Sequence, residues 1–228
     1  MSTTETSPIR DYCESLPKPE GPLFPEPREG GDPLLHELIL SMLVWNATPT
    51  QAAAAMGRIA ESVVDENELR VCFADDITDL LGPRYPRLEE RAERLLRVLN
   101  AVYAEEHGMT LEGLRDTSKR EARVYLDTLD GIPPFVAARV FLLGLGGHAF
   151  PIDERITQLL IEDEIIEAEA DAPGTMARFE RAFRAGEAGP MYRRLEAALN
   201  GKTARSAPTR RKRSAPSSPK TKRSAAKP

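Results

Sequence analysis

Apolar residues recur along this chain with the spacing of an α-helix. Across residues 86–107, Leu88, Leu95 and Leu99 are separated by steps of seven and four residues, which places them on one helical face. A wider apolar stripe over residues 34–45 is typical of a well buried helix. No segment shows the apolar–polar alternation of a half-buried strand. The pattern therefore predicts an all-α protein.

Capping residues, prolines and glycines mark where these helices begin and end. Asp32-Pro33 and Thr48-Pro49 each place a capping side chain before a proline that suits the first helical position. Gly108 ends the long helix, whose outer face is expected to carry arginines. Those arginines are Arg87, Arg91, Arg94 and Arg97. Later helices are expected over 153–166, 175–184 and 190–199.

The two ends of the chain differ from its middle. Residues 1–31 contain six prolines among polar residues, and we interpret them as an arm that is either disordered or draped on the body, with disorder favoured. Residues 201–228 contain no large apolar residue and are expected to form a disordered tail. A helical body over residues 32–200 lies between them.

Charge is divided unevenly between body and tail. The tail has ten Lys or Arg residues and no Asp or Glu, although the whole chain carries a net charge of −5. The first 200 residues hold the remaining 21 basic residues against 36 acidic ones, a balance of −15. A basic tail suggests a polyanionic partner, and a solubilising role is the alternative.

Composition excludes several classes of protein. The two cysteines, Cys13 and Cys72, and the three scattered histidines provide neither a disulfide framework nor the spacing of a metal site. We therefore expect no metal and no cofactor. No apolar run approaches the ~20 residues of a membrane span, and residues 1–5 do not resemble a signal peptide. These features predict a soluble, cytoplasmic protein.

Residues 119–146 form the most informative pattern. Two helical segments flank Leu129-Asp130-Gly131-Ile132-Pro133-Pro134, a short turn with one glycine and two prolines. A turn of this kind can direct backbone N–H groups outward, where they and the helix dipole favour a phosphate. Taken alone, it fits any pair of packed helices equally well.

This segment resembles the hairpin of the endonuclease III-like helix-hairpin-helix (HhH-GPD) DNA glycosylases. That motif reads Leu-Pro-Gly-Val-Gly, followed by an alanine-containing helix and a catalytic aspartate. Leu129, Gly131, Ile132 and Ala137 match it, and Asp153 falls at the expected separation. Residues 40–48 also resemble the family's early helix, which ends Leu-Leu-Ser-x-Gln-x-Thr. The similarity covers residues 32–199.

The resemblance implies a two-lobed helical fold, a duplex DNA partner and a set of site residues. Asp153 would be the catalytic carboxylate, and its alternative role is to cap the helix that begins at Glu154. Asn46 stands where many members use glutamine to fill the space left by an extruded base. Trp45 and Tyr125 are candidates for the base pocket, although core packing explains them equally well. The backbone contacts to phosphate would come from Gly131, Ile132, Phe135 and Val136.

Four departures from the family pattern modify this interpretation. Pro133 and Pro134 remove two N–H donors from the turn. Phe135 occupies the position of the Schiff-base lysine of bifunctional members. The four cysteines of the family's iron–sulfur loop are absent. Glu154-Arg155 replaces the usual Thr-His after the aspartate.

The favoured hypothesis is a monomeric, monofunctional DNA glycosylase without lyase activity or iron–sulfur cluster, associated with the nucleoid. A non-catalytic DNA-binding module that keeps the fold, or a helical protein–protein adaptor, are the alternatives. The tail would add salt-sensitive affinity for the DNA backbone without reading sequence. Its densest basic run is Arg210, Arg211, Lys212 and Arg213.

Overall fold

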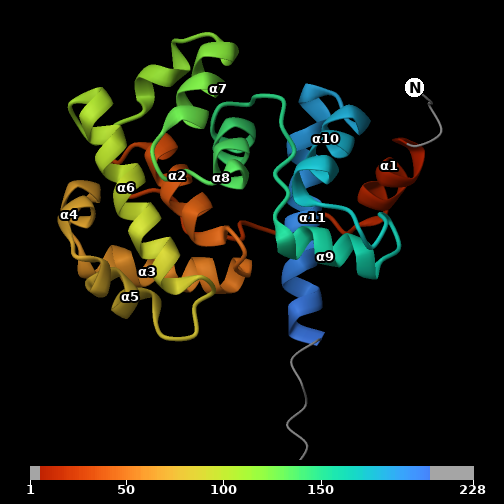
Figure 1. The fold of residues 1–228 in the computed structure, drawn as a ribbon, viewed down its shortest axis with the longest axis horizontal. Helices are drawn as coiled ribbons and strands as arrows, with labels where there is room; N and C mark the ends of the chain where they lie inside the picture. Colours follow the sequence, from red (N-terminus) through yellow and green to blue (C-terminus); the bar gives the residue numbers. More distant parts are fainter. Residues whose placement is uncertain (1–5, 206–228) are drawn as a thin grey trace, which may run out of the picture.

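The structure, a computed structural model, describes the backbone of residues 6–205 and the side chains of residues 8–200. Within this part of the chain all regular elements are helical, and they form two lobes (Figure 1). The predicted all-α, two-lobed architecture is therefore confirmed. None of the described helices combines the length and the apolar character needed to cross a bilayer.

The larger lobe is built around α2, whose residues are buried on almost every side. It packs against α3, α6, α8 and the π-helical segment η2. The predicted hairpin is present as α7, the turn, α8 and η2. The elements of this lobe are α2 (Pro33–Val44), α3 (Pro49–Ser62), α4 (Glu66–Val71), α5 (Ala74–Leu81), α6 (Leu88–Glu106), the 3₁₀ turn η1 (Glu112–Arg115), α7 (Lys119–Thr128), α8 (Pro134–Arg139) and η2 (Val140–Gly144).

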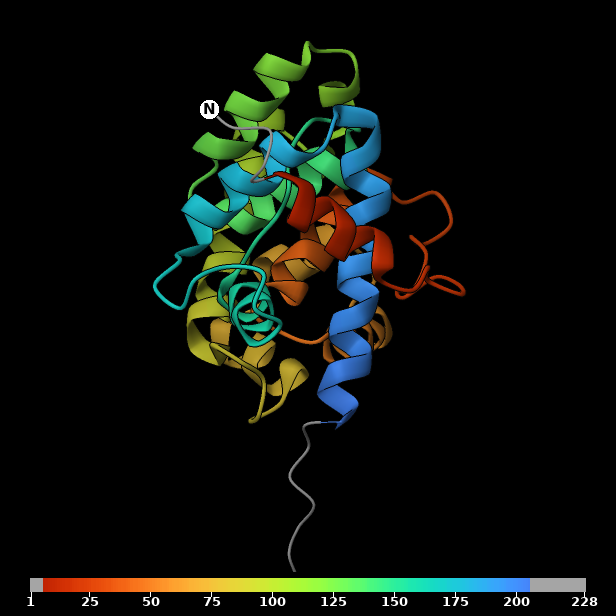
Figure 2. The ribbon, with the colours of Figure 1, turned by 90° about the vertical axis from the view of Figure 1, so that its right-hand side faces the viewer.

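The smaller lobe joins the first helix of the chain to the last three (Figure 2). Its aromatic centre is Phe150, whose ring lies 4.9 Å from that of Phe179 and 5.5 Å from that of Phe183. Tyr192 meets Phe150 edge-on at 5.9 Å, a favourable geometry for aromatic rings. The helices of this lobe are α1 (Thr6–Ser15), α9 (Glu154–Glu162), α10 (Ala172–Ala182) and α11 (Ala185–Arg205).

Residues 6–31 of the proline-rich arm are draped on the body, so the prediction of disorder is corrected for this segment and the alternative of a packed arm is the one observed. Ile9 and Cys13 of α1 are buried in the core. The following extended segment is fixed by Phe24, whose ring lies 5.3 Å from the guanidinium of Arg139. Arg28 donates to carbonyl groups at the end of α3. Proline richness disfavours regular structure, yet these packing and capping contacts hold the arm against both lobes.

The boundaries of three helices also differ from the predictions. Pro190 was expected to open the last helix, which instead begins at Ala185 and contains Pro190. The start is set by Glu187, whose carboxylate accepts a hydrogen bond from the Arg184 amide at 2.9 Å. The helix expected over 153–166 ends at Glu162. The helix expected over 175–184 is α10, which begins at Ala172, after Asp171 caps it.

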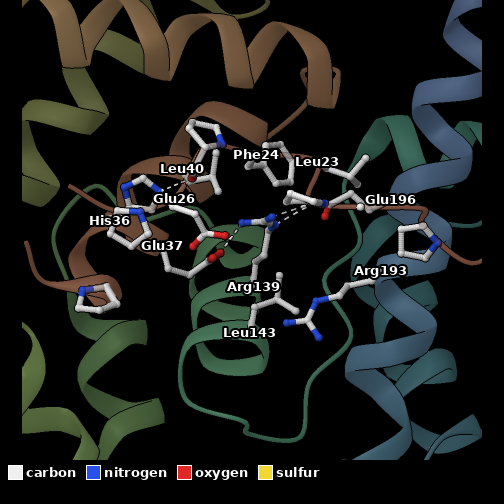
Figure 3. A pocket seen from close by; sticks show the side chains of 16 residues that line it. Leu23, Phe24, Glu26, His36, Glu37, Leu40, Arg139, Leu143, Arg193 and Glu196 are labelled. Atoms are coloured by element: carbon white, nitrogen blue, oxygen red, sulfur yellow. Dashed lines mark hydrogen bonds and ion pairs between the residues drawn. The ribbon is translucent and has the colours of Figure 1, made fainter. Parts of the chain in front are cut away.

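A buried ion network joins the two lobes beneath the arm. Arg139 of α8 is 1% exposed and lies between the carboxylates of Glu37 and Glu196 (Figure 3). Its Nε–Glu196 Oε1 distance is 3.1 Å, and Nη1 also donates to the Ser41 hydroxyl at 2.9 Å. Burial raises the pKa of Glu37, and the charge of Arg139 opposes this rise. Helices α2, α8 and α11 are thus connected by one guanidinium.

Replacing Arg139 by alanine should destabilise the protein by about 3–5 kcal/mol, because two buried carboxylates would lose their countercharge. Denaturant unfolding followed by circular dichroism measures this difference. The matched control is Arg178→Ala, which removes a largely exposed ion pair with Glu167 and should change stability by less than about 1 kcal/mol. Equal effects of the two substitutions would contradict the role given to Arg139.

Candidate active-site cleft between the lobes

A cleft of about 430 Å³ opens between the lobes. The larger lobe supplies the end of α2, one side chain of α7 and the start of α8. The smaller lobe supplies the start of α9 and one face of α10. The lining residues are Trp45, Asn46, Arg123, Pro133, Pro134, Phe135, Ile152, Asp153, Glu154, Ala172, Pro173, Met176, Ala177 and Glu180.

Asp153 is the buried carboxylate of this cleft and is 3% exposed. One oxygen accepts a hydrogen bond from the Ile156 amide at 2.8 Å, so Asp153 is the N-cap of α9. The other oxygen accepts from the Asn46 amide, across the lobe interface, at 2.7 Å. Two backbone donors from different lobes therefore fix the plane of the carboxylate. The predicted capping role is confirmed, and it places the same group at the cleft.

The ionisation of Asp153 is set by opposing influences. Burial raises the pKa of Asp153, whereas the charge of Arg155 and the hydrogen bonds from Ile156 and Asn46 oppose this rise. The three side-chain nitrogens of Arg155 are buried and have no hydrogen-bond partner among the described residues. A guanidinium without hydrogen-bond partners acts mainly through its charge. In a poorly solvated site this charge strongly favours the ionised form of a nearby carboxylate.

The turn that carries Asn46 is held by a buried arginine. Arg91 was expected on the outer face of α6 but is fully buried. Its guanidinium donates to the carbonyl groups of Met42, Leu43 and Trp45, which end α2 and lack helical partners. Burial lowers the pKa of Arg91 to about 10. These contacts position Asn46, which adopts a left-handed backbone with φ of 54°.

Trp45 lies at the edge of the cleft rather than in the core. Its ring is half-buried, and the guanidinium carbons of Arg87, Arg91 and Arg94 lie 5.1, 5.6 and 5.7 Å from its centre. Of the two aromatic candidates for a base pocket, the structure therefore places Trp45 at the cleft. Tyr125 lies on α7 beside a separate surface hollow.

The hairpin turn packs directly against α6. Gly131 has φ of +88°, and a Cβ atom there would lie 3.0 Å from Arg97 Cβ and 3.3 Å from the Arg94 carbonyl oxygen. Glycine is therefore required at this position. The Ile132 amide donates to Leu129 O at 3.2 Å, and the Val136 amide donates to Pro133 O at 2.9 Å.

Some of the backbone N–H groups that were predicted to bind phosphate therefore already donate hydrogen bonds within the protein. Ile132 and Val136 already use their amides within the turn. The Gly131 amide and the Phe135 amide, the latter in the first turn of α8, are the remaining candidates. The role of these four residues in binding DNA stays a prediction.

No lysine is found among the described side chains that line the cleft. Phe135 is buried at the cleft wall, where the resemblance would place a Schiff-base lysine. Lys119 lies at the start of α7 and donates to the Leu145 carbonyl at the end of η2. Lys18 is exposed in the arm. These two are the only lysines before residue 201.

The donor set does not fit an iron–sulfur cluster of the family type, which needs four thiolates. The chain has two cysteines in all, and they lie in different lobes, Cys13 in α1 and Cys72 at the end of α4. Among the described residues no group of three or more His, Cys, Asp or Glu side chains is placed to hold a metal ion.

Sequence reasoning found some lining residues and missed others. Asp153, Asn46 and Phe135 are brought together at the cleft, as expected. The contribution of α10, including Met176 and Ala177, was not predicted, because an amphipathic helix does not reveal which of its residues face a cleft. The tail residues Arg210, Arg211, Lys212 and Arg213 lie outside the described part of the chain.

Comparison with solved structures identifies the fold. A non-covalent endonuclease III–DNA complex aligns with a TM-score of 0.62 and 11% identity, covering 86% of this chain and 85% of that one. The H. pylori 3-methyladenine DNA glycosylase MagIII bound to 1,N6-ethenoadenine gives 0.56 and 12%, covering 89% and 96%. MBOgg1 in complex with a low-affinity DNA ligand gives 0.55 and 19%, covering 73% of this chain and 60% of MBOgg1.

The fold of this chain is the helical fold seen in these endonuclease III-like DNA glycosylase structures. This chain has that fold at low sequence identity to each of these structures. It spans 60% of the length of MBOgg1. No protein-family model matches the sequence, and a search of curated proteins gives no match either.

Asp153 should titrate above the ordinary aspartate value of 3.8, because its ionised form is desolvated in the folded protein. Because its pKa is raised on folding, Asp153 stabilises the folded protein at pH values below its pKa in the unfolded chain. This contribution is lost as the pH rises through its pKa in the folded protein. Carboxyl ¹³C NMR titration measures the midpoint directly.

Arg155→Gln should raise this midpoint further, since it removes the charge that favours the carboxylate. Arg178→Gln, on α10 and paired with Glu167, serves as the control and should leave it unchanged. An unchanged or lowered midpoint in the Arg155 variant would show that the two groups are not coupled as described.

Proposed function

We propose that this chain is a monofunctional DNA glycosylase that hydrolyses the N-glycosidic bond of a damaged or mismatched base. The observation that carries the proposal is the position of Asp153, a buried carboxylate fixed by two backbone amides in a cleft between the lobes. The fold shared with DNA glycosylases supports it, and the absence of a cleft lysine among the described side chains favours hydrolysis without a lyase step.

The geometry suits the chemistry of glycosidic cleavage. Departure of the base builds oxocarbenium character on the sugar, and a carboxylate in a partly dry site stabilises that positive charge. Asp153 has this environment, and the amides of Asn46 and Ile156 hold it without neutralising it. An ionised Asp153 can also orient or deprotonate the attacking water. The proton balance is simple, because water supplies the hydroxyl group to the sugar and a proton to the base.

The substrate must leave the duplex to reach this carboxylate. The glycosidic carbon is shielded in stacked DNA, so the nucleotide has to be extruded into the cleft. Trp45, Phe135 and Met176 give the cleft apolar and aromatic walls suited to a planar base. In this proposal Asn46 lies at the mouth, the hairpin contacts the DNA backbone and the basic tail adds non-specific affinity. The protein is expected to act as a monomer, without a cofactor.

A panel of duplexes, each with one lesion or mismatch, tests the proposal. Purified protein should produce abasic sites that become strand breaks only after alkali. Borohydride should trap no covalent protein–DNA complex, because none of the described side chains that line the cleft is a lysine that could form an imine. The Asp153→Asn variant should lose activity by at least ~100-fold. Its fold should persist, since asparagine remains a good N-cap for α9.

The outcomes separate the alternatives. Strand breaks without alkali would refute the monofunctional assignment. Full activity in Asp153→Asn would refute the role of this carboxylate. Inactivity across the panel, with duplex binding retained, would favour a non-catalytic DNA-binding module. Pro133, Phe135 and Glu154 are the residues that favour this alternative. Absence of duplex binding would favour the adaptor alternative.

A further inference from the structure

Two arginines of α6 lie directly against the hairpin turn. Arg94 Nη1 donates to the Gly131 carbonyl oxygen at 3.1 Å, and Arg94 Nε also pairs with Glu90 at 2.9 Å. Arg97 is one turn further along α6, and its Nε donates to Asp130 Oδ2 at 3.0 Å. Its Nη2 pairs with the other oxygen of the same carboxylate. Two guanidinium groups, each paired with a carboxylate, thus lie beside a turn that carries few free amides.

The turn needs donors from side chains if it is to bind an anion. Pro133 and Pro134 have no N–H groups, and the Ile132 and Val136 amides are used internally. Guanidinium groups are alternative donors for phosphate, and their fork geometry allows two parallel hydrogen bonds. Arg97 already makes such a two-point contact with a carboxylate, whose oxygen spacing resembles that of a phosphate.

The carboxylate of Asp130 therefore occupies the position of an anionic ligand. Arg97 binds both of its oxygens, and the neighbouring Gly131 amide also favours its charged form. The guanidinium of Arg97 lowers the pKa of Asp130, so the carboxylate is ionised at neutral pH. The Asp130 side chain is 66% exposed and that of Arg97 is 54% exposed. An exposed pair of this kind is open to exchange with another anion.

We propose that Arg94 and Arg97 form the backbone-phosphate site of this hairpin, and that Asp130 occupies it in the free protein and limits its affinity. This inference rests on the proposed function in taking duplex DNA as the ligand. A phosphate that approaches Arg97 must displace Asp130 or lie beside its negative charge. Arg97 therefore contributes less to the affinity for DNA than an unpaired arginine would contribute.

Asp130→Asn in the full-length chain tests the idea. Asparagine has nearly the same size and shape as aspartate, so the substitution removes the charge with little change to the packing of the turn. Fluorescence anisotropy with an undamaged duplex measures affinity across a series of salt concentrations. The variant should bind about 3- to 10-fold more tightly at low salt, and its salt slope should steepen by about one, because Arg97 now releases a counterion.

The companion variants make the test specific. Arg97→Gln should weaken binding, and Asp130→Asn should no longer steepen the salt slope when Arg97 is also replaced. The matched control is Glu167→Gln, which frees Arg178 from a comparably exposed ion pair in the smaller lobe and should leave the affinity within about twofold. Circular dichroism and thermal unfolding confirm that each variant is folded.

Unchanged or weaker binding by Asp130→Asn would overturn the proposal, as would an equal gain in Glu167→Gln. The result is independent of catalysis. Tighter binding by Asp130→Asn in a protein that excises no base would support the phosphate site and reject the enzyme. Base excision with no response to Asp130 or Arg97 would do the reverse.

Discussion

The cleft depends on one buried guanidinium at the end of α2. Arg91 gathers three carbonyl groups that the helix leaves without partners, and this fixes the turn through Asn46. The Asn46 amide in turn holds Asp153 from across the lobe interface. An arginine is suited to this task because its planar donors reach several acceptors at once. Removing this guanidinium from water is costly. That cost is offset by its hydrogen bonds to the carbonyl groups, by the aromatic rings of Trp45 and Tyr85 and by the nearby carboxylate of Asp153.

Structure and proposed chemistry make opposite demands on Asp153. As the cap of α9 it stabilises the helix, whereas its burial as an anion opposes folding. The same conflict occurs at Arg155, whose buried guanidinium lacks a partner among the described residues. Groups with such perturbed environments are concentrated in functional sites, where stability is exchanged for reactivity. The rest of the molecule supports this through the Phe150 cluster and the network around Arg139.

Sequence reasoning was most successful where a local rule dominates. Capping signals located α2 and α3, and the glycine turn located the hairpin, because these features depend on neighbouring residues. It failed where tertiary contacts decide. The prolines of the arm outweighed the few apolar residues of α1, and nothing in the pattern showed that Phe24 would pack on Arg139. Arg91 was predicted to lie on the surface, because the spacing of apolar residues does not show that an arginine will donate to buried carbonyl groups.

Because sequence reasoning depends on neighbouring residues, it could predict only part of the cleft. Asp153 and Asn46 were identified through the family resemblance, and their direct contact emerged only when the lobes were seen together. The wall formed by α10 consists of ordinary helical residues, so no chemical signal distinguishes them. Asp130 passed unnoticed for a related reason. An exposed aspartate in a turn is unremarkable until the arginine that binds it is known to project from another helix.

The composition of the smaller lobe has a consequence for how the protein is made. Helix α1 packs on α10 and α11, from which it is separated by more than 150 residues. During synthesis the first helix must therefore wait, without its partner surface, until nearly all of the described chain has left the ribosome. The helices of the larger lobe all lie before residue 145, so this lobe can form earlier. The carboxylate of Asp153 and the wall of α10 that faces it would then be brought together last, so that a nascent chain completes the hairpin before it completes the cleft.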